Sequence, residues 1–329
     1  MLRVQDLRVQ FFGSASTVTA VDGISFSIER GERVGIVGES GSGKTMTALS
    51  ILRLVPEPGK ITSGRILFGE KDVVHMTDEE IREFRGSDAA MIFQDPMTSL
   101  NPVLRVGFQI EEAMAAHRRF TRQQAHERVI PIMKRVRIPA AEQRVRDYPH
   151  QFSGGMRQRV MIAMGISNEP SLLIADEPTT ALDVTVQASI IELLRDLSNE
   201  FAASVILITH NLSVVAGLCQ RVIVMYAGRI VEEGPTRAIF KNPQHPYTWS
   251  LLRSLPRIDE RGHEKLIAIS GLPPDLSNLP PGCKFHPRCR FRVDRCLTEE
   301  PSLDDVGEGQ CARCWVLMRN VLDPEAVMK

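Results

Sequence analysis

Residues 38–45 of this 329-residue chain read Gly-Glu-Ser-Gly-Ser-Gly-Lys-Thr, a glycine-rich turn that ends on a lysine and a hydroxyl. An apolar run, Arg33–Val37, leads into the turn, and Thr45–Leu54 has helical character. Such a turn presents several backbone N–H groups at a helix N-terminus, where the helix dipole adds positive potential. Side chains would block a close approach, so the turn needs glycines. The pattern predicts a phosphate-binding loop and an α/β fold of the P-loop NTPase type.

This loop assigns roles to individual residues. Lys44 is predicted to reach the β- and γ-phosphates of a nucleotide, and Thr45 to place its hydroxyl on Mg²⁺. The other predicted phosphate-binding residues are Gly38, Ser40, Gly41, Ser42 and Gly43. A glycine-rich turn without a ligand is the alternative, and the flanking strand and helix patterns disfavour it.

The composition of the chain excludes several classes of protein. Lys and Arg number 40, as do Asp and Glu, and this balance argues against nucleic acid or another polyanion as a partner. The N-terminus lacks the basic-then-apolar pattern of a secretory signal. Residues 204–225, the most apolar stretch, are interrupted by polar side chains and are not expected to span a membrane. We therefore expect a cytoplasmic protein whose cysteines stay reduced.

Apolar runs alternate with helical patterns up to about residue 240, as in an α/β sheet with crossover helices. A capping box is predicted at Thr77–Glu80, and apolar spacing predicts a helix over 186–201. Residues 105–165 lack convincing strands and are predicted to be a helical insertion. The predicted buried strands are Arg33–Val37, Ala89–Phe93, Leu172–Ala175, Val205–Thr209 and Val222–Tyr226.

Two carboxylates follow the predicted strand Leu172–Ala175. A buried strand beside the phosphate loop would deliver Asp176 to the Mg²⁺ shell. Glu177 would then face the γ-phosphate and polarise the attacking water as a general base. The alternative is an ordinary acidic helix N-terminus, which is disfavoured in a chain that also has a phosphate loop.

A second anion-binding pattern is Ser153-Gly154-Gly155 at the predicted start of a helix. One nucleotide does not need two such sites in one chain. The two glycine-rich motifs and the Asp-Glu strand together resemble the ATP-binding subunits of ABC transporters. The resemblance implies that Ser153, Gly154 and Gly155 of one subunit close over the ATP that the partner subunit holds.

The same resemblance implies further site residues. Gln94 would sense the metal and the attacking water and contact the membrane subunit. Asp183, in the segment 181–183, would belong to the D-loop. His210 would contact the γ-phosphate, although a lone histidine after a strand is usually structural.

An aromatic ring that stacks on adenine is expected before the phosphate loop. Phe11 and Phe12 are both candidates, and the sequence does not decide between them. Phe12 is slightly favoured because it opens the turn at Gly13.

Residues 91–103, 152–166 and 242–256 resemble the oligopeptide/dipeptide/nickel importer subfamily in particular. The resemblance implies an ABC nucleotide-binding domain at 1–250, with its helical subdomain at about 97–165, and a C-terminal tail at 251–329. It also implies an ATPase that uses ATP and Mg²⁺ and lies on the cytoplasmic face of the inner membrane as a peripheral protein. Its partners would be a related, non-identical second ATPase, two transmembrane permease subunits and, indirectly, a peptide-binding protein.

Three alternatives stay open. The first is an importer of nickel or another small solute, because the ATPase does not touch the solute. The second is a soluble ABC protein of translation or DNA repair, which normally has tandem cassettes or coiled coils; this chain has a single phosphate loop. The third is a non-catalytic regulatory module, against which the intact Glu177 and His210 argue.

Five of the six cysteines follow proline-rich segments near the C-terminus, and Cys219 stands alone. We expect these five in a small Cys-rich C-terminal domain. The resemblance implies that four of them bind a 4Fe-4S cluster, which takes four thiolates, and that Cys311 is a spare thiol. Because the nucleotide motifs all lie before residue 211, the cluster is expected to be structural or regulatory. The implied ligands are Cys283, Cys289, Cys296 and Cys314.

The spacing of these cysteines is poor for a zinc ribbon, but zinc and a metal-free tail stay open as alternatives. Cationic residues between them would offset the negative charge of a cluster, unless they form an ordinary solvated face or a nucleic-acid patch. These cations are Lys284, Arg288, Arg290, Arg292 and Arg295.

Overall fold

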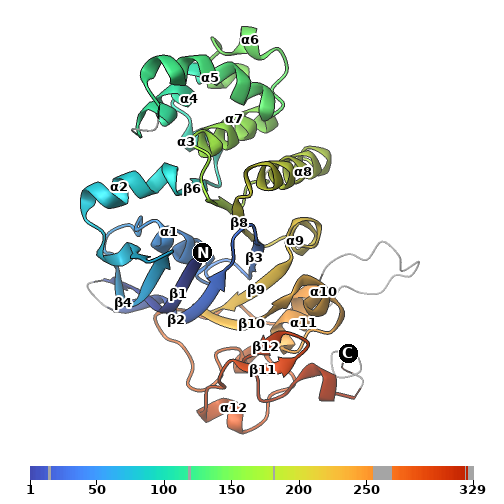
Figure 1. Cartoon of the computed structure of the whole chain (residues 1–329). Helices are drawn as coiled ribbons and strands as arrows, with labels where there is room; N and C mark the ends of the chain where they lie inside the picture. The colour runs from blue at the N-terminus through green and yellow to red at the C-terminus, as the bar shows by residue number, and fades with distance from the viewer. Residues whose placement is uncertain (14–15, 118–119, 181, 255–268, 323, 325–329) are drawn as a thin grey trace.

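The computed structural model describes the chain except for residues 14–15, 118–119, 181, 255–268, 323 and 325–329 (Figure 1). Two sheets form its framework, one of four strands and one of eight.

The eight-stranded sheet has the order β11-β12-β10-β9-β3-β8-β7-β6. Its five consecutive parallel strands are those that the sequence predicts, with ends that differ by a residue at most, so this part of the prediction is confirmed. They are β3 (Arg33–Val37), β6 (Ala89–Ile92), β7 (Leu172–Asp176), β8 (Ser204–Thr209) and β9 (Arg221–Tyr226).

The parallel strands are apolar along their whole length because both faces of the sheet are covered. In β8, Ile206 and Ile208 pack into one core and Val205 and Leu207 into the other. One core lies on the side of the smaller sheet, and the other includes the helices of the insertion.

The smaller sheet is antiparallel, with the order β2-β1-β4-β5, and it is absent from the strands predicted above. In β1, Leu2, Val4, Leu7 and Val9 are buried, but the register with β2 shifts between Val4 and Leu7, where Asp6 has φ 48°. This shift breaks the two-residue period by which such strands are found in a sequence. The strands are β1 (Leu2–Phe12), β2 (Thr17–Ile28), β4 (Gly59–Phe68) and β5 (Lys71–Asp72).

The predicted helical insertion is confirmed. Between β6 and β7, the described residues form helices α3 to α7, which project from the sheet as one arm (Figure 1). The bounds are α3 (Pro96–Ser99), α4 (Val106–Ala115), α5 (Arg122–Arg135), α6 (Ala141–Arg144), the 3-10 turn η2 (Pro149–Gln151) and α7 (Gly154–Ile166).

Two other helices were also predicted correctly. The Thr77 hydroxyl accepts a hydrogen bond from Glu80 N–H and the Glu80 carboxylate accepts one from Thr77 N–H, which is the expected capping box. The helix expected over 186–201 is α8. The helices outside the arm and before residue 255 are α1 (Lys44–Ile51), η1 (Val73–His75), α2 (Asp78–Ser87), α8 (Val184–Phe201), α9 (Leu212–Leu218), α10 (Thr236–Lys241) and α11 (Pro246–Arg253).

The C-terminal region shares the large sheet, because its strand β12 pairs with β10 in antiparallel fashion. The domain boundaries given above stay predictions, but this pairing ties the tail to the rest of the fold. The elements concerned are β10 (Arg229–Pro235), η3 (His286–Arg288), α12 (Arg295–Thr298), β11 (Asp304–Gly307), β12 (Gln310–Ala312) and η4 (Met318–Asn320).

A buried carboxylate fastens this junction. Glu232 of β10 is fully buried and accepts hydrogen bonds from Gln244 N–H at 2.6 Å and His245 N–H at 2.9 Å. Burial raises the pKa of Glu232 to about 7, although its hydrogen bonds act in the opposite direction. Because these N–H groups precede α11, the carboxylate holds the start of that helix against β10.

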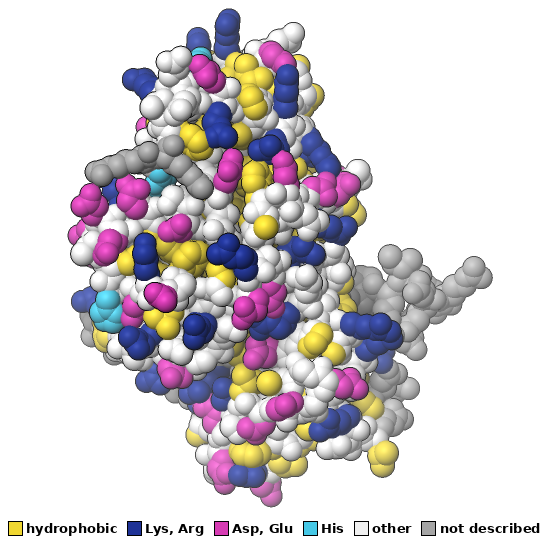
Figure 2. All heavy atoms as spheres, in the orientation of Figure 1, with side chains coloured by type: hydrophobic (Ala, Val, Ile, Leu, Met, Phe, Trp, Pro, Cys, Tyr) yellow, Lys and Arg dark blue, Asp and Glu magenta, His cyan; other side chains and the backbone are white. Residues whose placement is uncertain are grey.

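The surface carries both signs of charge. Figure 2 shows Lys and Arg side chains interspersed with Asp and Glu over the face in view, in keeping with a formal net charge of zero. Among the described helices, none is both long and apolar enough to span a bilayer.

Candidate active site

The phosphate loop joins the end of β3 to the start of α1. Gly43 has φ 101°, and a Cβ atom there would lie 2.5 Å from Ala20 O. A Cβ atom at Gly38 would lie 2.2 Å from Met225 O. Both positions therefore require glycine, because the backbone of other strands passes directly behind the loop.

Lys44 lies across this loop. Its Nζ atom donates hydrogen bonds to Gly38 O and Glu39 O, each at 2.8 Å. Burial lowers the pKa of Lys44, while the nearby Glu177 and Asp176 carboxylates act in the opposite direction. The ammonium group is thus held beside the backbone that the sequence assigns to phosphate binding.

Thr45 and Asp176 form an oxygen-rich pair next to the loop. Thr45 Oγ1 donates to Asp176 Oδ1 at 3.3 Å, and Asp176 is only 3% exposed. Burial raises the pKa of Asp176, and the hydrogen bond from Thr45 and the charge of Lys44 offset only part of this. Carboxylate and hydroxyl oxygens suit Mg²⁺, so these two residues fit the predicted cation.

Glu177 is the centre of a hydrogen-bonded group. Its Oε1 atom lies 3.1 Å from His210 Nδ1, and its Oε2 atom accepts from Gln94 Nε2 at 3.3 Å and Thr180 Oγ1 at 2.8 Å. Burial acts to raise the pKa of Glu177, but the hydrogen bonds with His210 and Thr180 prevail and hold it below its usual range. The carboxylate is therefore ionised at neutral pH, as a general base requires.

Sequence reasoning missed Thr180. A threonine three residues after Glu177 has no distinctive pattern of its own, and only the turn after β7 shows that its hydroxyl reaches the carboxylate.

The predicted signature segment does not share this hydrogen-bonded group. The Ser153 hydroxyl caps α7 by accepting from Met156 N–H, and a Cβ atom at Gly155 would lie 2.6 Å from Val186 of α8. Asp183 caps α8 by accepting from Val186 N–H at 2.9 Å. Ser153, Gly154 and Asp183 are exposed, so the starts of α7 and α8 form one accessible surface. Ala181, in the predicted D-loop segment, lies outside the described residues.

The two phenylalanines proposed for adenine stacking differ in environment. Phe12 is 47% exposed at the end of β1. Phe11 is half-buried and packs against the core beside Gly59, where a Cβ atom would lie 2.6 Å from its ring. The exposed ring of Phe12 is the better candidate.

Five of the six cysteines lie in the tail. Four of them line one small cavity: Cys283, Cys289, Cys296 and Cys314. Cys311 lies apart from them, on β12 opposite Glu233 of β10. Burial raises the pKa of Cys289 to about 12 and also raises those of Cys283 and Cys314. Thiolates there would need a compensating cation.

In the part of the chain that the structure describes, no three His, Cys, Asp or Glu side chains lie close enough together to hold one metal ion. Four thiolates around zinc would lie about 3.8 Å from one another, as follows from Zn–S bonds of about 2.3 Å. The iron–sulfur cluster therefore stays a prediction, and the arrangement gives no support to a zinc site.

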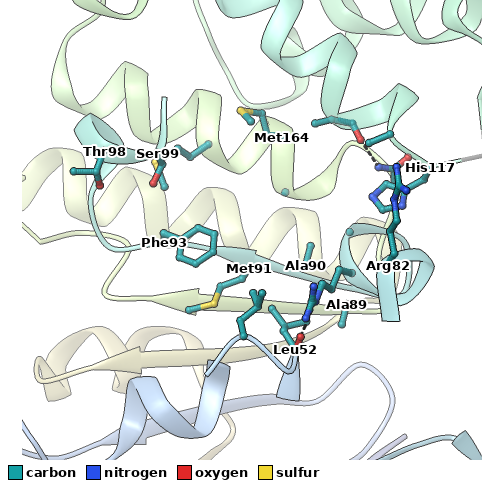
Figure 3. Close-up of a pocket in the computed structure, with 18 residues that line it drawn as sticks. Leu52, Arg82, Ala89, Ala90, Met91, Phe93, Thr98, Ser99, His117 and Met164 are labelled. Atoms are coloured by element: carbon teal, nitrogen blue, oxygen red, sulfur yellow. Dashed lines mark hydrogen bonds between the residues drawn. The ribbon is translucent and has the colours of Figure 1, made fainter. Parts of the chain in front are cut away.

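A groove of about 650 Å³ lies between the core and the helical arm. Figure 3 shows Thr98 and Ser99 at one end, His117 and Arg82 at the other, and Phe93 between them. Because Gln94 directly follows Phe93 and hydrogen bonds to Glu177, one short segment links this groove to the candidate general base.

Comparison with known proteins gives two family matches. Residues 21–180 match the ABC transporter family, and residues 231–296 match the C-terminal region of oligopeptide/dipeptide transporters. The chain is 47% identical to the oligopeptide transport ATP-binding protein OppD of Bacillus subtilis, covering 99% of this chain and 92% of OppD. It is 50% identical to the dipeptide transport ATP-binding protein DppD of the same organism, covering 96% and 94% of the two chains.

Solved structures show the same core. The dimeric ATP-binding cassette MJ0796 bound to ADP and Pi matches with a TM-score of 0.64 and 27% identity, over 72% of this chain and 99% of that chain. CbiO1 of Clostridium perfringens matches with a TM-score of 0.63 and 31% identity, over 73% and 90%. The chain therefore belongs to the oligopeptide/dipeptide family of ABC transporters, as an ATP-binding ATPase subunit.

Proposed function

We propose that this subunit hydrolyses ATP to drive the import of oligopeptides or dipeptides. The observation that carries the proposal is the ionised Glu177, held by Gln94, Thr180 and His210 beside the pair Thr45–Asp176. Identity close to one half over nearly the whole length of OppD and DppD supports peptides as the solute.

The chemistry divides among the residues of this site. Lys44 and the loop 38–45 would bind the phosphates, and Thr45 and Asp176 would hold Mg²⁺ with Gln94 nearby. Mg²⁺ neutralises the charge that develops on the transferring phosphoryl group. Glu177 would accept the proton of the attacking water, and His210 would orient Glu177 and contact the γ-phosphate.

The full catalytic site is proposed to need two ATPase subunits. Ser153, Gly154 and Asp183 are exposed on a surface built by α7 and α8, whereas the Glu177 group belongs to the sheet. MJ0796, which resembles this chain, is dimeric with ADP and Pi bound. We propose that the exposed surface closes over the ATP of a related, non-identical second subunit.

The groove in Figure 3 is proposed to receive a helix of a permease subunit. It is lined largely by apolar side chains and leads directly to Gln94, so a helix seated there would sense the state of Glu177. In the assembled importer, two transmembrane permeases would cross the membrane and a peptide-binding protein would lie outside it. The ATPase would lie on the cytoplasmic face of the membrane.

The tail is proposed to bind one 4Fe-4S cluster through Cys283, Cys289, Cys296 and Cys314. The four thiols line one cavity, and their number suits a cubane cluster. A cluster is larger than a single ion, so its ligands can stand farther apart than zinc would allow.

Glu177→Gln is expected to retain ATP binding while hydrolysis by the assembled transporter falls by about 10²-fold or more, because the amide cannot accept the proton. ATP affinity and steady-state hydrolysis measure the two effects. Glu70→Gln, at an exposed turn, is the control. Wild-type turnover in Glu177→Gln would show that another group is the base.

Gly154→Asp is expected to leave ATP binding to the isolated subunit unchanged and to lower hydrolysis by the complex about 10²-fold, because a carboxylate would face the partner's phosphates. Gly154 suits this test since a Cβ atom there makes only an ordinary contact, 3.5 Å from Leu182. Gly154→Ala is the matched control and should stay active. Weaker ATP binding by the isolated Gly154→Asp subunit would mean that the motif serves its own nucleotide.

Ala116→Trp is expected to fill the groove and lower peptide uptake about tenfold or more, because the docked helix would be displaced. Co-purification of the permeases from mild detergent should fall in parallel, with ATP affinity unchanged. Ala115→Trp adds the same bulk on an exposed neighbour outside the groove and should have little effect. Normal permease binding by Ala116→Trp would place the docking site elsewhere.

Anaerobically purified protein is expected to be brown and to contain iron and acid-labile sulfide near four per chain, as for a cubane cluster. Cys296→Ser should abolish both, since Cys296 lines the shared cavity, whereas Cys311→Ser should change neither. Iron and sulfide analyses provide the measurement. Stoichiometric zinc without sulfide, or an equal requirement for Cys311, would refute this ligand set.

A further inference from the structure

An ion pair joins the Cys-rich tail to the phosphate loop. Arg288 follows Cys283 by five residues and directly precedes Cys289. Its Nη1 atom donates to Glu39 Oε2 at 2.6 Å and its Nη2 atom to Glu39 Oε1 at 3.0 Å. Glu39 is the second residue of the phosphate loop. Arg288, 249 positions further along the chain, therefore forms a bidentate ion pair with the loop.

This pair is well enclosed. The Arg288 side chain is 7% exposed and that of Glu39 is 24% exposed. Arg288 Nε also donates to Ser270 O at 3.0 Å, which fixes the guanidinium from the tail side. A bidentate pair between a planar guanidinium and a carboxylate is directional, and shielding from water strengthens it relative to an exposed pair.

The backbone of Glu39 is held from the same direction. Glu39 N–H donates to the Tyr247 hydroxyl at 2.8 Å. The Phe285 ring, in the same turn as Arg288, packs against Tyr247 and Tyr226 with ring centroids 5.3 Å and 5.2 Å apart. The turn between two cavity-lining cysteines thus constrains both the side chain and the main chain of Glu39.

These contacts have a consequence for the nucleotide. Glu39 O accepts a hydrogen bond from Lys44 Nζ, so the orientation of Glu39 influences where the phosphate-binding ammonium lies. A free carboxylate at the loop would also repel a polyphosphate, and the guanidinium neutralises it. Both effects would favour nucleotide binding.

We propose that Arg288 is a positioning residue for ATP, which holds the phosphate loop in its binding conformation through Glu39. The tail then takes part in nucleotide binding, although every nucleotide motif lies before residue 211. This inference rests on the assignment of residues 38–45 as the phosphate loop.

The test measures ATP affinity of the full-length, anaerobically purified chain. Arg288→Met keeps an unbranched side chain and removes the charge, and it is expected to weaken ATP binding about tenfold. Arg288→Lys restores the charge without the fork and should recover part of the loss. Arg295→Met is the matched control: Arg295 also directly precedes a cavity-lining cysteine and pairs with a glutamate, Glu299, but this pair is exposed.

A double-mutant cycle shows whether Arg288 acts through Glu39. Glu39→Gln combined with Arg288→Met should bind ATP no more weakly than Arg288→Met alone, because each change removes the same interaction. Simple additivity of the two losses would overturn the proposal. So would unchanged affinity in Arg288→Met, or an equal loss in Arg295→Met, which would indicate general damage to the tail.

Lys44→Ala separates this inference from the assignment on which it rests. Loss of ATP binding in Lys44→Ala supports the phosphate loop independently of Arg288. Retention of ATP binding would overturn the loop assignment, and the role of Arg288 with it.

Discussion

The site depends on the register of four neighbouring parallel strands. Val37 is paired with Thr209, Asp176 with Ile208, and Ile92 with Ala175, so the carboxyl ends of β3, β8, β7 and β6 are nearly level. The residues that follow these strands therefore meet at one edge of the sheet. A slip of one residue in any pairing would turn the side chains at that strand's end to the opposite face. The hydrogen bonds that join Glu177 to Gln94 and His210 would then be lost.

The same sheet explains why one chain is proposed to hold only part of a catalytic site. Lys44, Asp176 and Glu177 are held by hydrogen bonds at the edge of the sheet. Ser153 and Gly154 are fixed to the start of α7 in the helical arm, where the adjacent Gly155 lies against Val186 of α8. Because two rigid elements carry the two anion-binding motifs, completing a site with a second subunit requires only that the two surfaces approach.

The tail is bound to this framework by strand pairing, buried charge and aromatic packing. β12 extends the large sheet beside β10, Glu232 holds the start of α11, and Phe285 packs on Tyr226 and Tyr247. A segment held in this way can constrain the phosphate loop, and the ion pair between Arg288 and Glu39 is the contact through which it does so. Cys283, Phe285 and Cys289, which flank Arg288 in the sequence, also line the thiol-lined cavity. The order of the tail and the order of the loop are therefore connected.

Features that depend on local chemistry could be predicted from the sequence alone. The glycines of the loop, the apolar parallel strands, the capping box at Thr77 and the carboxylates after β7 each leave a short pattern in the sequence. The strands do so because both faces of a parallel sheet are covered, which makes each strand a continuous apolar run. The antiparallel sheet was missed because the register shift near Asp6 interrupts its period. Only the tertiary structure showed that Thr180 reaches Glu177, that Phe12 and not Phe11 is exposed, and that Arg288 reaches Glu39. These outcomes depend on contacts between distant segments and on burial, which no local spacing of residues specifies.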